Sequence, residues 1–328
     1  MRAFALVMLL LAAFAASAQQ HAFKQLTTRD GLAQSQVRAM AHDADGYLWF
    51  GTLGGASRFD GRFFRNISVQ DGLPDPQVSA IARSADGALW LGCGNRIVRV
   101  KGIPGTDAGA RVLGMEAAPG GDLFIGTDGG GVHVRGKSGI KPLSGYPEDA
   151  PNVRALLLLR DGTLLVGHRN GLLHCADGAC RSVPVGDPEG KLVSALAEAT
   201  DGSWWVGTLG NGLYRIGRDG ALVSEYDEEN GLLQNNVRCL LLDDQERLWI
   251  GSKLGLNRLE GERMRTFTVH QGLPNDNIHC AFQDREGNLW FGTDGAVALR
   301  YLGDAYVTFT MKDGLCSDLV MSITADSH

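Results

Sequence analysis

Four residues that can carry a positive charge occupy equivalent positions in this sequence, each directly after a valine or isoleucine that recurs about every 41 residues. They are Arg38, Arg154, Arg238 and His279. Guanidinium groups donate hydrogen bonds in a planar fork that suits anionic and oxygen-rich ligands. Repeats arranged around an axis would bring these side chains to one axial mouth. The alternative is that the arginines pair with neighbouring carboxylates or backbone carbonyls, because an unpaired buried charge is costly.

Amide side chains are common in the loops that lead into the first strand of each repeat. The loops that follow the second strand also carry polar side chains, and we expect both sets of loops on the same side of the molecule. The predicted ligand-binding set therefore adds Asn235, Asn236, Asn275 and Asn277 to the four cationic positions. The other polar residues of these loops are Gln34, Gln36, Asp75, Gln77 and Asn152 on entry, and Asp128, His168, Arg169, Asn170, Asn211, Lys253 and Asp294 after the second strand. Amides around guanidinium groups suit a hydroxylated or anionic ligand. An acidic sugar or oligosaccharide is the small-molecule partner that we expect.

Residue patterns typical of enzymes and metal sites do not occur in this sequence. The eight histidines are scattered, none has His-Glu-x-x-His spacing, and there is no Gly-x-Ser-x-Gly elbow. The segment Asp43-Ala-Asp-Gly46 resembles part of a calcium loop, but it lies where each repeat needs a hairpin turn. We therefore predict no catalytic residue, no metal site and no cofactor.

The six cysteines allow one local disulfide. Cys175 and Cys180 flank a four-residue turn and could bridge the two strands of a hairpin, subject to geometry; the alternative is a pair of free thiols. Cys239 and Cys280 occupy a position that is small in every repeat, so we interpret them as buried small apolar residues. Cys93 and Cys316 have no evident partner.

An internal repeat organises the chain. The motif of Leu48-Trp-Phe-Gly-Thr52 occurs seven times in the chain, and its bulky second residue and its glycine predict a packed core. The bulky residues are Trp49, Trp90, Phe124, Leu165, Trp205, Trp249 and Trp290; the glycines are Gly51, Gly92, Gly126, Gly167, Gly207, Gly251 and Gly292. Twelve residues before each bulky residue lies a β-branched marker residue: Val37, Val78, Val112, Val153, Val193, Val237 and Ile278.

Each unit alternates apolar residues over short segments separated by Asp-Gly and other glycine turns, which indicates four short antiparallel strands. About 41 residues of this kind form one propeller blade. We predict an all-β, seven-bladed β-propeller of four-stranded antiparallel blades over residues 19–311. Residues 22–28 are expected to close the ring against the seventh blade, which leaves residues 306–311 displaced; the alternative is a loose N-terminal tail.

The N-terminus has the features of an export signal. Arg2, an apolar run from Phe4 to Phe14 and a small-x-small site predict a signal peptide over residues 1–18, cleaved after Ala18. The apolar run is too short for a membrane helix, which needs about 20 residues. No later stretch is apolar enough, so we expect an exported, periplasmic chain with no membrane span.

Composition restricts the possible partners. Glycine accounts for 45 of 328 residues, which fits many tight turns, and the formal net charge is −6. A net negative charge argues against a general nucleic-acid surface. We therefore expect no nucleic-acid partner.

Whole units resemble a known family. Gly272-Leu-Pro leads to Ile278 and then to Asn288-Leu-Trp-Phe-Gly-Thr293, and Gly72-Leu-Pro leads similarly to Trp90. This pattern is similar to the two-component regulator propeller, the periplasmic sensor region of hybrid histidine kinases and of some diguanylate cyclases. The first, second, sixth and seventh units show it clearly. The third, fourth and fifth lack Gly-Leu-Pro, and the third and fourth also lack the tryptophan.

The resemblance implies a sensor without chemistry of its own. It also implies a second propeller, a β-sandwich, a membrane helix and a cytoplasmic output domain. Residues 312–328 open a further blade, so the sequence is expected to be a fragment or the product of a truncated gene. Two other functions stay open: a periplasmic propeller enzyme, such as a lyase or hydrolase acting on a polysaccharide or antibiotic, and a protein-interaction scaffold.

Overall fold

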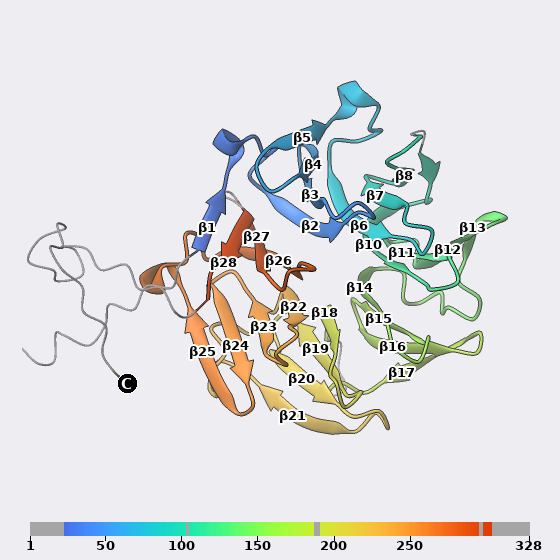
Figure 1. Ribbon diagram of the computed structural model, residues 1–328. Coiled ribbons are helices and arrows are strands. Elements are labelled where there is room, and N and C mark those ends of the chain that lie inside the picture. The colour runs from blue at the N-terminus through green and yellow to red at the C-terminus, as the bar shows by residue number, and fades with distance from the viewer. Residues whose placement is uncertain (1–22, 103–104, 187–190, 295–297, 304–328) are drawn as a thin grey trace, which may run out of the picture.

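The computed structural model describes residues 23–102, 105–186, 191–294 and 298–303. Within these residues the chain forms seven four-stranded antiparallel sheets arranged around a ring (Figure 1). Each sheet is one blade, and its innermost strand is the one that contains the marker valine or isoleucine or begins shortly after it. The prediction of an all-β, seven-bladed propeller is confirmed. Predictions for residues 1–22 and 304–328, including the signal peptide, the displaced segment and the further blade, lie outside the described residues.

The strands follow chain order within six of the blades. Blades 1 to 3 are β2 (Val37–His42), β3 (Leu48–Thr52), β4 (Gly55–Phe59), β5 (Phe64–Ile67); β6 (Val78–Arg83), β7 (Leu89–Cys93), β8 (Arg96–Arg99), β9 (Thr106–Asp107); and β10 (Arg111–Ala117), β11 (Leu123–Asp128), β12 (Val132–Gly136), β13 (Gly139–Pro142). Blades 4 to 6 are β14 (Val153–Leu158), β15 (Leu164–His168), β16 (Gly171–Ala176), β17 (Ala179–Val183); β18 (Val193–Glu198), β19 (Trp204–Thr208), β20 (Leu213–Ile216), β21 (Leu222–Tyr226); and β22 (Cys239–Leu242), β23 (Leu248–Gly251), β24 (Leu256–Glu260), β25 (Arg263–Phe267).

Blade 7 combines the two ends of the described chain. Its strands are β26 (Ile278–Gln283), β27 (Leu289–Thr293), β28 (Ala298–Tyr301) and, as the outer strand, β1 (Phe23–Leu26). Phe23 pairs with Tyr301 and Leu26 with Ala298. Figure 1 shows the N-terminal strand beside β28. The predicted closure by the N-terminal strand is confirmed.

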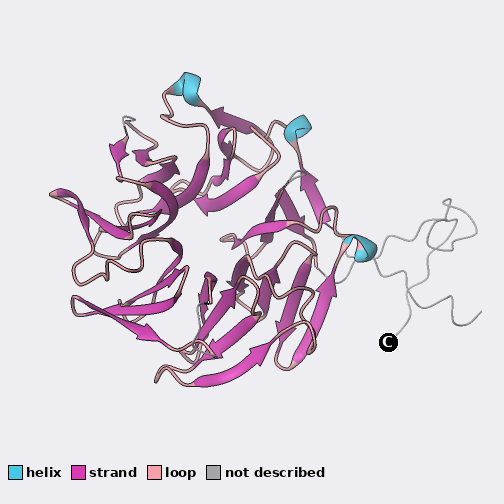
Figure 2. Cartoon of the chain, turned by 180° about the vertical axis from the view of Figure 1, so that it is seen from behind, coloured by secondary structure: helices cyan, strands magenta, loops and turns pink. Residues whose placement is uncertain are grey.

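The helices in the described residues are three short 3-10 turns: η1 (Thr28–Asp30), η2 (Val69–Asp71) and η3 (Val269–Gln271), which lie toward the rim (Figure 2). The glycines that follow η2 and η3 have φ of 103° and 93°, a conformation that favours glycine. The next residues, Leu73 and Leu273, are buried. The Gly-Leu pair therefore ends an outer turn and anchors the chain before it enters the next innermost strand.

The two repeated markers fit each other between blades. A Cβ atom built on the motif glycine of any blade would lie within 2.9 Å of a side-chain carbon of the next blade's marker valine or isoleucine. The seven pairs are Gly51–Val78, Gly92–Val112, Gly126–Val153, Gly167–Val193, Gly207–Val237, Gly251–Ile278 and Gly292–Val37. Only glycine leaves room for this contact, which explains why both markers keep a constant spacing.

This packing predicts a selective cost for one methyl group. Gly207→Ala is expected to lower the free energy of unfolding by about 1–3 kcal/mol, because the new Cβ overlaps Val237 in a packed interface. Gly114→Ala is the matched control, since a Cβ there meets no heavy atom within 4 Å. Urea unfolding measures both, and Val237→Ala in the Gly207→Ala background should recover part of the loss. Equal effects of the two glycine variants would contradict the assignment.

The repeated tryptophans are core residues, as predicted. Trp49, Trp90, Trp205, Trp249 and Trp290 are 0–6% exposed. In four blades the indole nitrogen donates to the first side chain of the hairpin turn: Asp43 at 2.8 Å, Ser84 at 3.1 Å, Asp243 at 2.8 Å and Asp284 at 2.7 Å.

Phe124 is a correction, because it is only partly buried. Its side chain lies at the margin of the cluster between blades 3 and 4, against which it packs. Leu165, the other substitute for tryptophan, is fully buried.

The cysteines fall into two groups. Cys175 and Cys180 face each other across β16 and β17 and form a disulfide. Cys93 is buried; Cys239 and Cys280 are partly buried as whole residues, but burial raises the pKa of both thiols, so their sulfurs are covered as interpreted. Their sulfurs lie over Gly251 and Gly292, where they share the space at the blade interface with the next marker residue.

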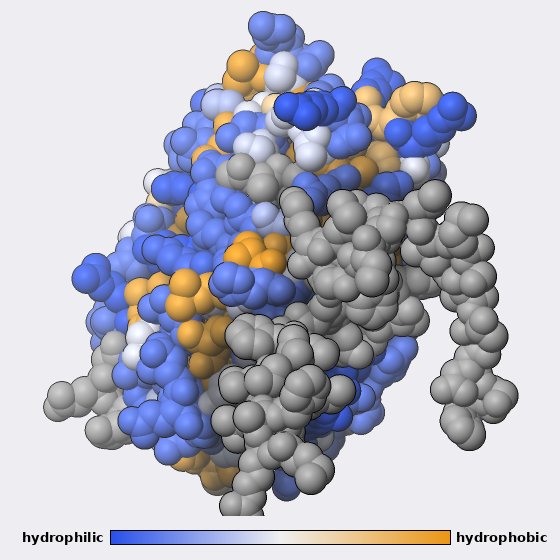
Figure 3. Space-filling model, turned by 90° about the vertical axis from the view of Figure 1, so that its left-hand side faces the viewer, coloured by the Kyte–Doolittle hydropathy of each residue, from blue (hydrophilic) through white to orange (hydrophobic). Residues whose placement is uncertain are grey.

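The side of the molecule shown in Figure 3 is mostly hydrophilic where it is described, with small apolar patches. No helix in the described residues is long and apolar enough to cross a membrane.

Candidate functional site

A β-bulge on the innermost strand positions the predicted cationic residues. In blade 1, Val37 pairs with Thr52 and Ala39 with Gly51, so that Arg38 between them is the extra residue. The same register shift frees Arg154 in blade 4 and His279 in blade 7. In blade 6 the regular ladder begins at Cys239, directly after Arg238. A bulge re-aims the extra side chain, and here it turns this position away from the packed faces of the sheet.

Three of the four residues meet in one hydrogen-bonded group, which we call the axial cluster: Gln36, Arg38, Arg238, Asn277, His279 and Asp294. Arg38 Nη1 is 3.1 Å from both ring nitrogens of His279, and Arg238 Nη1 lies 3.1 Å from His279 Nε2. The two guanidinium groups therefore contact one imidazole. They come from blades 1 and 6, on either side of blade 7.

Loop residues complete the axial cluster. Arg238 Nη1 donates to Asn277 Oδ1 at 2.7 Å. Asp294 accepts from Asn277 Nδ2 at 3.4 Å, lies 3.1 Å from His279 Nε2 and accepts from the Gln36 amide. Asp294 is thus the carboxylate in this group, opposed by two arginines.

The electrostatics leave the axial cluster with excess positive charge. Burial lowers the pKa of His279, and the charges of Arg38 and Arg238 lower it further, against the hydrogen bond to Asp294. Burial also raises the pKa of Asp294, but its hydrogen bond to His279 and the nearby cations outweigh burial, and the net pKa is lowered. The imidazole is therefore neutral and the carboxylate charged at neutral pH, so two guanidinium groups face one carboxylate.

One donor of the axial cluster is unused. Arg38 Nε is buried and has no hydrogen-bond partner in the described part of the chain. Unpaired buried donors are rare and costly, and they are found where a ligand or water completes the site. An anionic oxygen at this position would satisfy the donor and balance the charge.

The remaining predicted residues do not join the axial cluster. Arg154 lies 3.7 Å from Asp128 on the neighbouring blade, which is the pairing that we kept as the alternative. Asn235 Oδ1 accepts from Glu228 N at 3.0 Å, and Asn275 Oδ1 accepts from Asn277 N at 2.8 Å. Asn236 pairs through its backbone with Leu209. These asparagines shape the loops, whereas Gln36 and Asp294 supply side chains to the group.

Comparisons with known proteins agree with the repeat analysis. Three stretches, residues 31–54, 231–253 and 272–295, match the model of the two component regulator propeller. They include the parts of blades 1, 6 and 7 that supply the axial cluster. These three stretches are similar to the repeats of the two component regulator propeller, which confirms the resemblance stated above for units 1, 6 and 7.

Histidine kinase P4 of Formosa agariphila is 27% identical over 154 residues, which cover 41% of this chain and 11% of that kinase. The extracellular domain of a putative hybrid two component system from B. thetaiotaomicron has a TM-score of 0.73 at 21% identity. That match covers 85% of this chain and 39% of the other. The chain thus spans a minor part of both proteins.

A streptogramin B lyase shares the fold as well, with a TM-score of 0.71 at 15% identity; the match covers 88% of this chain and 99% of the lyase. Propellers of this shape therefore occur both in the extracellular domain of a two component system and in a lyase, and the fold alone does not decide between these functions.

Proposed function

We propose that this chain is the extracytoplasmic sensor domain of a signalling protein of the two-component or cyclic-di-GMP type, and that it binds an anionic, hydroxylated ligand such as an acidic sugar. It performs no chemistry itself. The regulator repeats and the kinase relative support the sensor role. The observation that carries the ligand class is the axial cluster, in which two arginines face one carboxylate and Arg38 Nε has no partner among the described residues.

The geometry suits recognition of a carboxylate or sulfate on a sugar. Hydrogen bonds from guanidinium groups to anions are stronger than neutral ones, and the half-buried setting reduces screening by solvent. Neighbouring amides can hold ring hydroxyls. Binding would draw Arg38 and Arg238 toward the ligand, and these residues lie on different blades. A ligand that engages both arginines would therefore change the contacts between blades 1, 6 and 7, and this change is the input for the signal.

The location and the partners belong to the same proposal. Residues 1–18 would direct the chain to the periplasm, where the Cys175–Cys180 disulfide is chemically favoured. A second propeller and the membrane and output domains would be supplied by other parts of the signalling protein. Under this proposal the chain needs no cofactor and contacts no nucleic acid.

The experiment is a thermal-shift screen of the purified chain against charged and neutral glycans. An acidic glycan should raise the melting temperature, and Arg38→Ala and Arg238→Ala should each weaken its binding by roughly tenfold or more, because each removes a charged hydrogen bond worth about 1.5–3 kcal/mol. Arg154→Ala is the matched control, since Arg154 pairs with Asp128 outside the axial cluster. The melting temperature of each variant without ligand separates lost binding from lost stability.

Two results would overturn this site. In the first, Arg38→Ala and Arg238→Ala bind the glycan as well as the parent. In the second, Arg154→Ala weakens binding as much as they do. Turnover of a glycan or a streptogramin by the purified chain would favour the propeller enzyme instead, and a chain without any small ligand would favour the interaction scaffold.

A further inference from the structure

A second group of chemically active side chains lies where the ring closes, at the opposite end of β2 from the axial cluster. His42 ends β2, five residues after the marker Val37. The same position is Glu198 in blade 5 and Gln283 in blade 7. Each of these accepts a hydrogen bond at 2.9 Å from a backbone N–H in the preceding blade's hairpin turn, at Arg160 and Asp244. In these two blades the position therefore supplies an acceptor that links neighbouring blades, whereas in four others it is Arg83, Ala117, Leu158 or Leu242.

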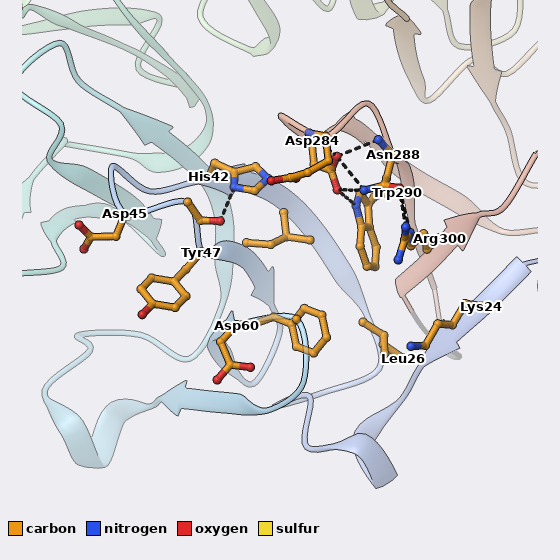
Figure 4. Close-up of a pocket in the computed structure, with 15 residues that line it drawn as sticks. Lys24, Leu26, His42, Asp45, Tyr47, Asp60, Asp284, Asn288, Trp290 and Arg300 are labelled. Atoms are coloured by element: carbon orange, nitrogen blue, oxygen red, sulfur yellow. Dashed lines mark hydrogen bonds between the residues drawn. The ribbon is translucent and has the colours of Figure 1, made fainter.

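His42 does not make that link. Its Nδ1 is 2.9 Å from the carbonyl oxygen of Gly46, so Nδ1 carries the proton and Nε2 has the free lone pair. The side chain is 9% exposed, and Nε2 is buried without a hydrogen-bond partner in the described residues. In Figure 4 the ring edge opposite the Gly46 bond points toward Asp284 of blade 7.

Two carboxylates lie close to this free nitrogen. One oxygen each of Asp284 and Glu286, together with a ring nitrogen of His42, lie within 4.8 Å of one another. Hydrogen bonds hold both oxygens of Asp284: Oδ2 accepts from Trp290 Nε1 at 2.7 Å and from Asn288 Nδ2 at 2.8 Å (Figure 4), and Oδ1 accepts from the backbone N–H groups of Asn288 at 2.7 Å and Glu286 at 3.1 Å. Metal-binding histidines typically donate their other N–H to a carbonyl, and metal-binding carboxylates are themselves hydrogen-bonded. His42 and Asp284 both have this arrangement.

We propose that His42 Nε2, Asp284 and Glu286 bind a divalent transition-metal ion of the zinc type. One imidazole nitrogen and two carboxylate oxygens form a donor set that suits zinc, and a fourth position stays open for water or a ligand oxygen. Ligand atoms around zinc are separated by about 3.3 Å, given bonds of about 2.0 Å in a tetrahedron. The exposed Glu286 can move in to close the remaining distance.

The surrounding hollow is large enough for such a site. It has a volume of about 370 Å³ and is lined by residues of blades 1 and 7, including β1. Lys24 and Arg300 line the same hollow, and Arg300 Nη2 donates a hydrogen bond to Asn288 Oδ1 at 2.6 Å. A metal ion here would cross-link β2 of blade 1 to the turn of blade 7. It would strengthen the interface at which the N-terminal strand completes the ring.

The test uses the untagged, chelator-treated chain, with Co²⁺ as the spectroscopic probe and Zn²⁺ as the competitor. We expect one Co²⁺ per chain with visible absorption typical of nitrogen and oxygen ligands, displacement by Zn²⁺, and a higher melting temperature with Zn²⁺. His42→Gln should weaken Co²⁺ binding by at least roughly tenfold. This variant places at the position the residue type found at 283, so it should fold. Glu286→Gln should weaken binding as well.

His174→Gln is the matched control, because His174 is a partly buried histidine that contacts Thr163 at 2.8 Å and lies in blade 4. It should bind Co²⁺ as the parent does. The proposal is overturned if the parent binds no Co²⁺, if His42→Gln binds it with parental affinity, or if the absorption shows thiolate ligands from the cysteines.

Discussion

Replacing Trp249 by alanine is expected to lower the free energy of unfolding by about 3–5 kcal/mol, the range for removal of a large buried aromatic side chain. Trp249 is 0% exposed. Its ring centre lies 5.3 Å from those of Phe267 and Phe291 and 5.1 Å from that of Tyr301. The substitution therefore leaves a cavity between blades 6 and 7 that these large rings cannot fill. Urea unfolding followed by fluorescence or circular dichroism measures the loss.

Two variants separate the contributions to this loss. Trp249→Phe keeps most of the ring but removes the hydrogen bond from Nε1 to Asp243, and its cost should be about 1–3 kcal/mol, because the buried carboxylate loses one of its donors while Arg247 Nε still donates to the same oxygen. Phe124→Ala removes a partly exposed ring at the equivalent position and should cost less than Trp249→Ala. An unchanged unfolding midpoint for Trp249→Ala would refute the core assignment.

The fold was predictable because the contact between neighbouring blades depends on two residues of each repeat, the marker valine or isoleucine and the motif glycine. A marker valine packs against the glycine of the preceding blade, so neither can change size without displacing a whole sheet. The sequence therefore shows two recurring residues, one β-branched and one glycine, at a constant distance from each other in every repeat. The outer strands have weaker constraints, and β9 has only two residues. Phe124 shows the limit of the pattern, since the sequence identifies its position but not how completely neighbouring side chains cover it.

The axial cluster was predictable only in part. The spacing placed Arg38, Arg238 and His279 at one end of the innermost strands, but it did not show which neighbours would pair. That choice depends on the bulge and on the loop carboxylates: Asp294 lies beside His279, whereas Asp128 takes Arg154. The grouping of blades 6, 7 and 1 also needs ring closure, because Arg38 and His279 are separated by 241 residues in sequence.

The sequence analysis did not predict the group of His42, Asp284 and Glu286. The equivalent position holds different residue types in the other blades, so a histidine there does not stand out. Its neighbours Asp284 and Glu286 lie more than 240 residues away in the sequence. Asp284 alone fits its role in the hairpin turn, where it accepts from Trp290. The combination becomes visible only when blade 7 is placed against blade 1.

The closure strand should be essential for stability although it is short. Leu26 is 5% exposed and packs in one cluster with Phe50, Phe59 and Trp290, which belong to blades 1 and 7. Leu26→Ala is expected to lower the free energy of unfolding by about 2–5 kcal/mol, as for other leucines removed from packed cores.

Gln25→Ala is the matched control on the same strand, because Gln25 is exposed and pairs only through its backbone with Leu299. It should change stability by less than about 0.5 kcal/mol. Amide hydrogen exchange gives a second measurement, since loss of β1 exposes the edge of β28 and should speed exchange at those β28 amides that face β1, relative to β23 in blade 6. If Leu26→Ala and Gln25→Ala unfold at the same urea concentration, or if exchange in β28 is unchanged, β1 is a dispensable tail. If the two variants separate as expected, the ring depends on a contact between the first and last described strands, and the interface between blades 7 and 1 is where a ligand or metal ion would have the largest effect on stability.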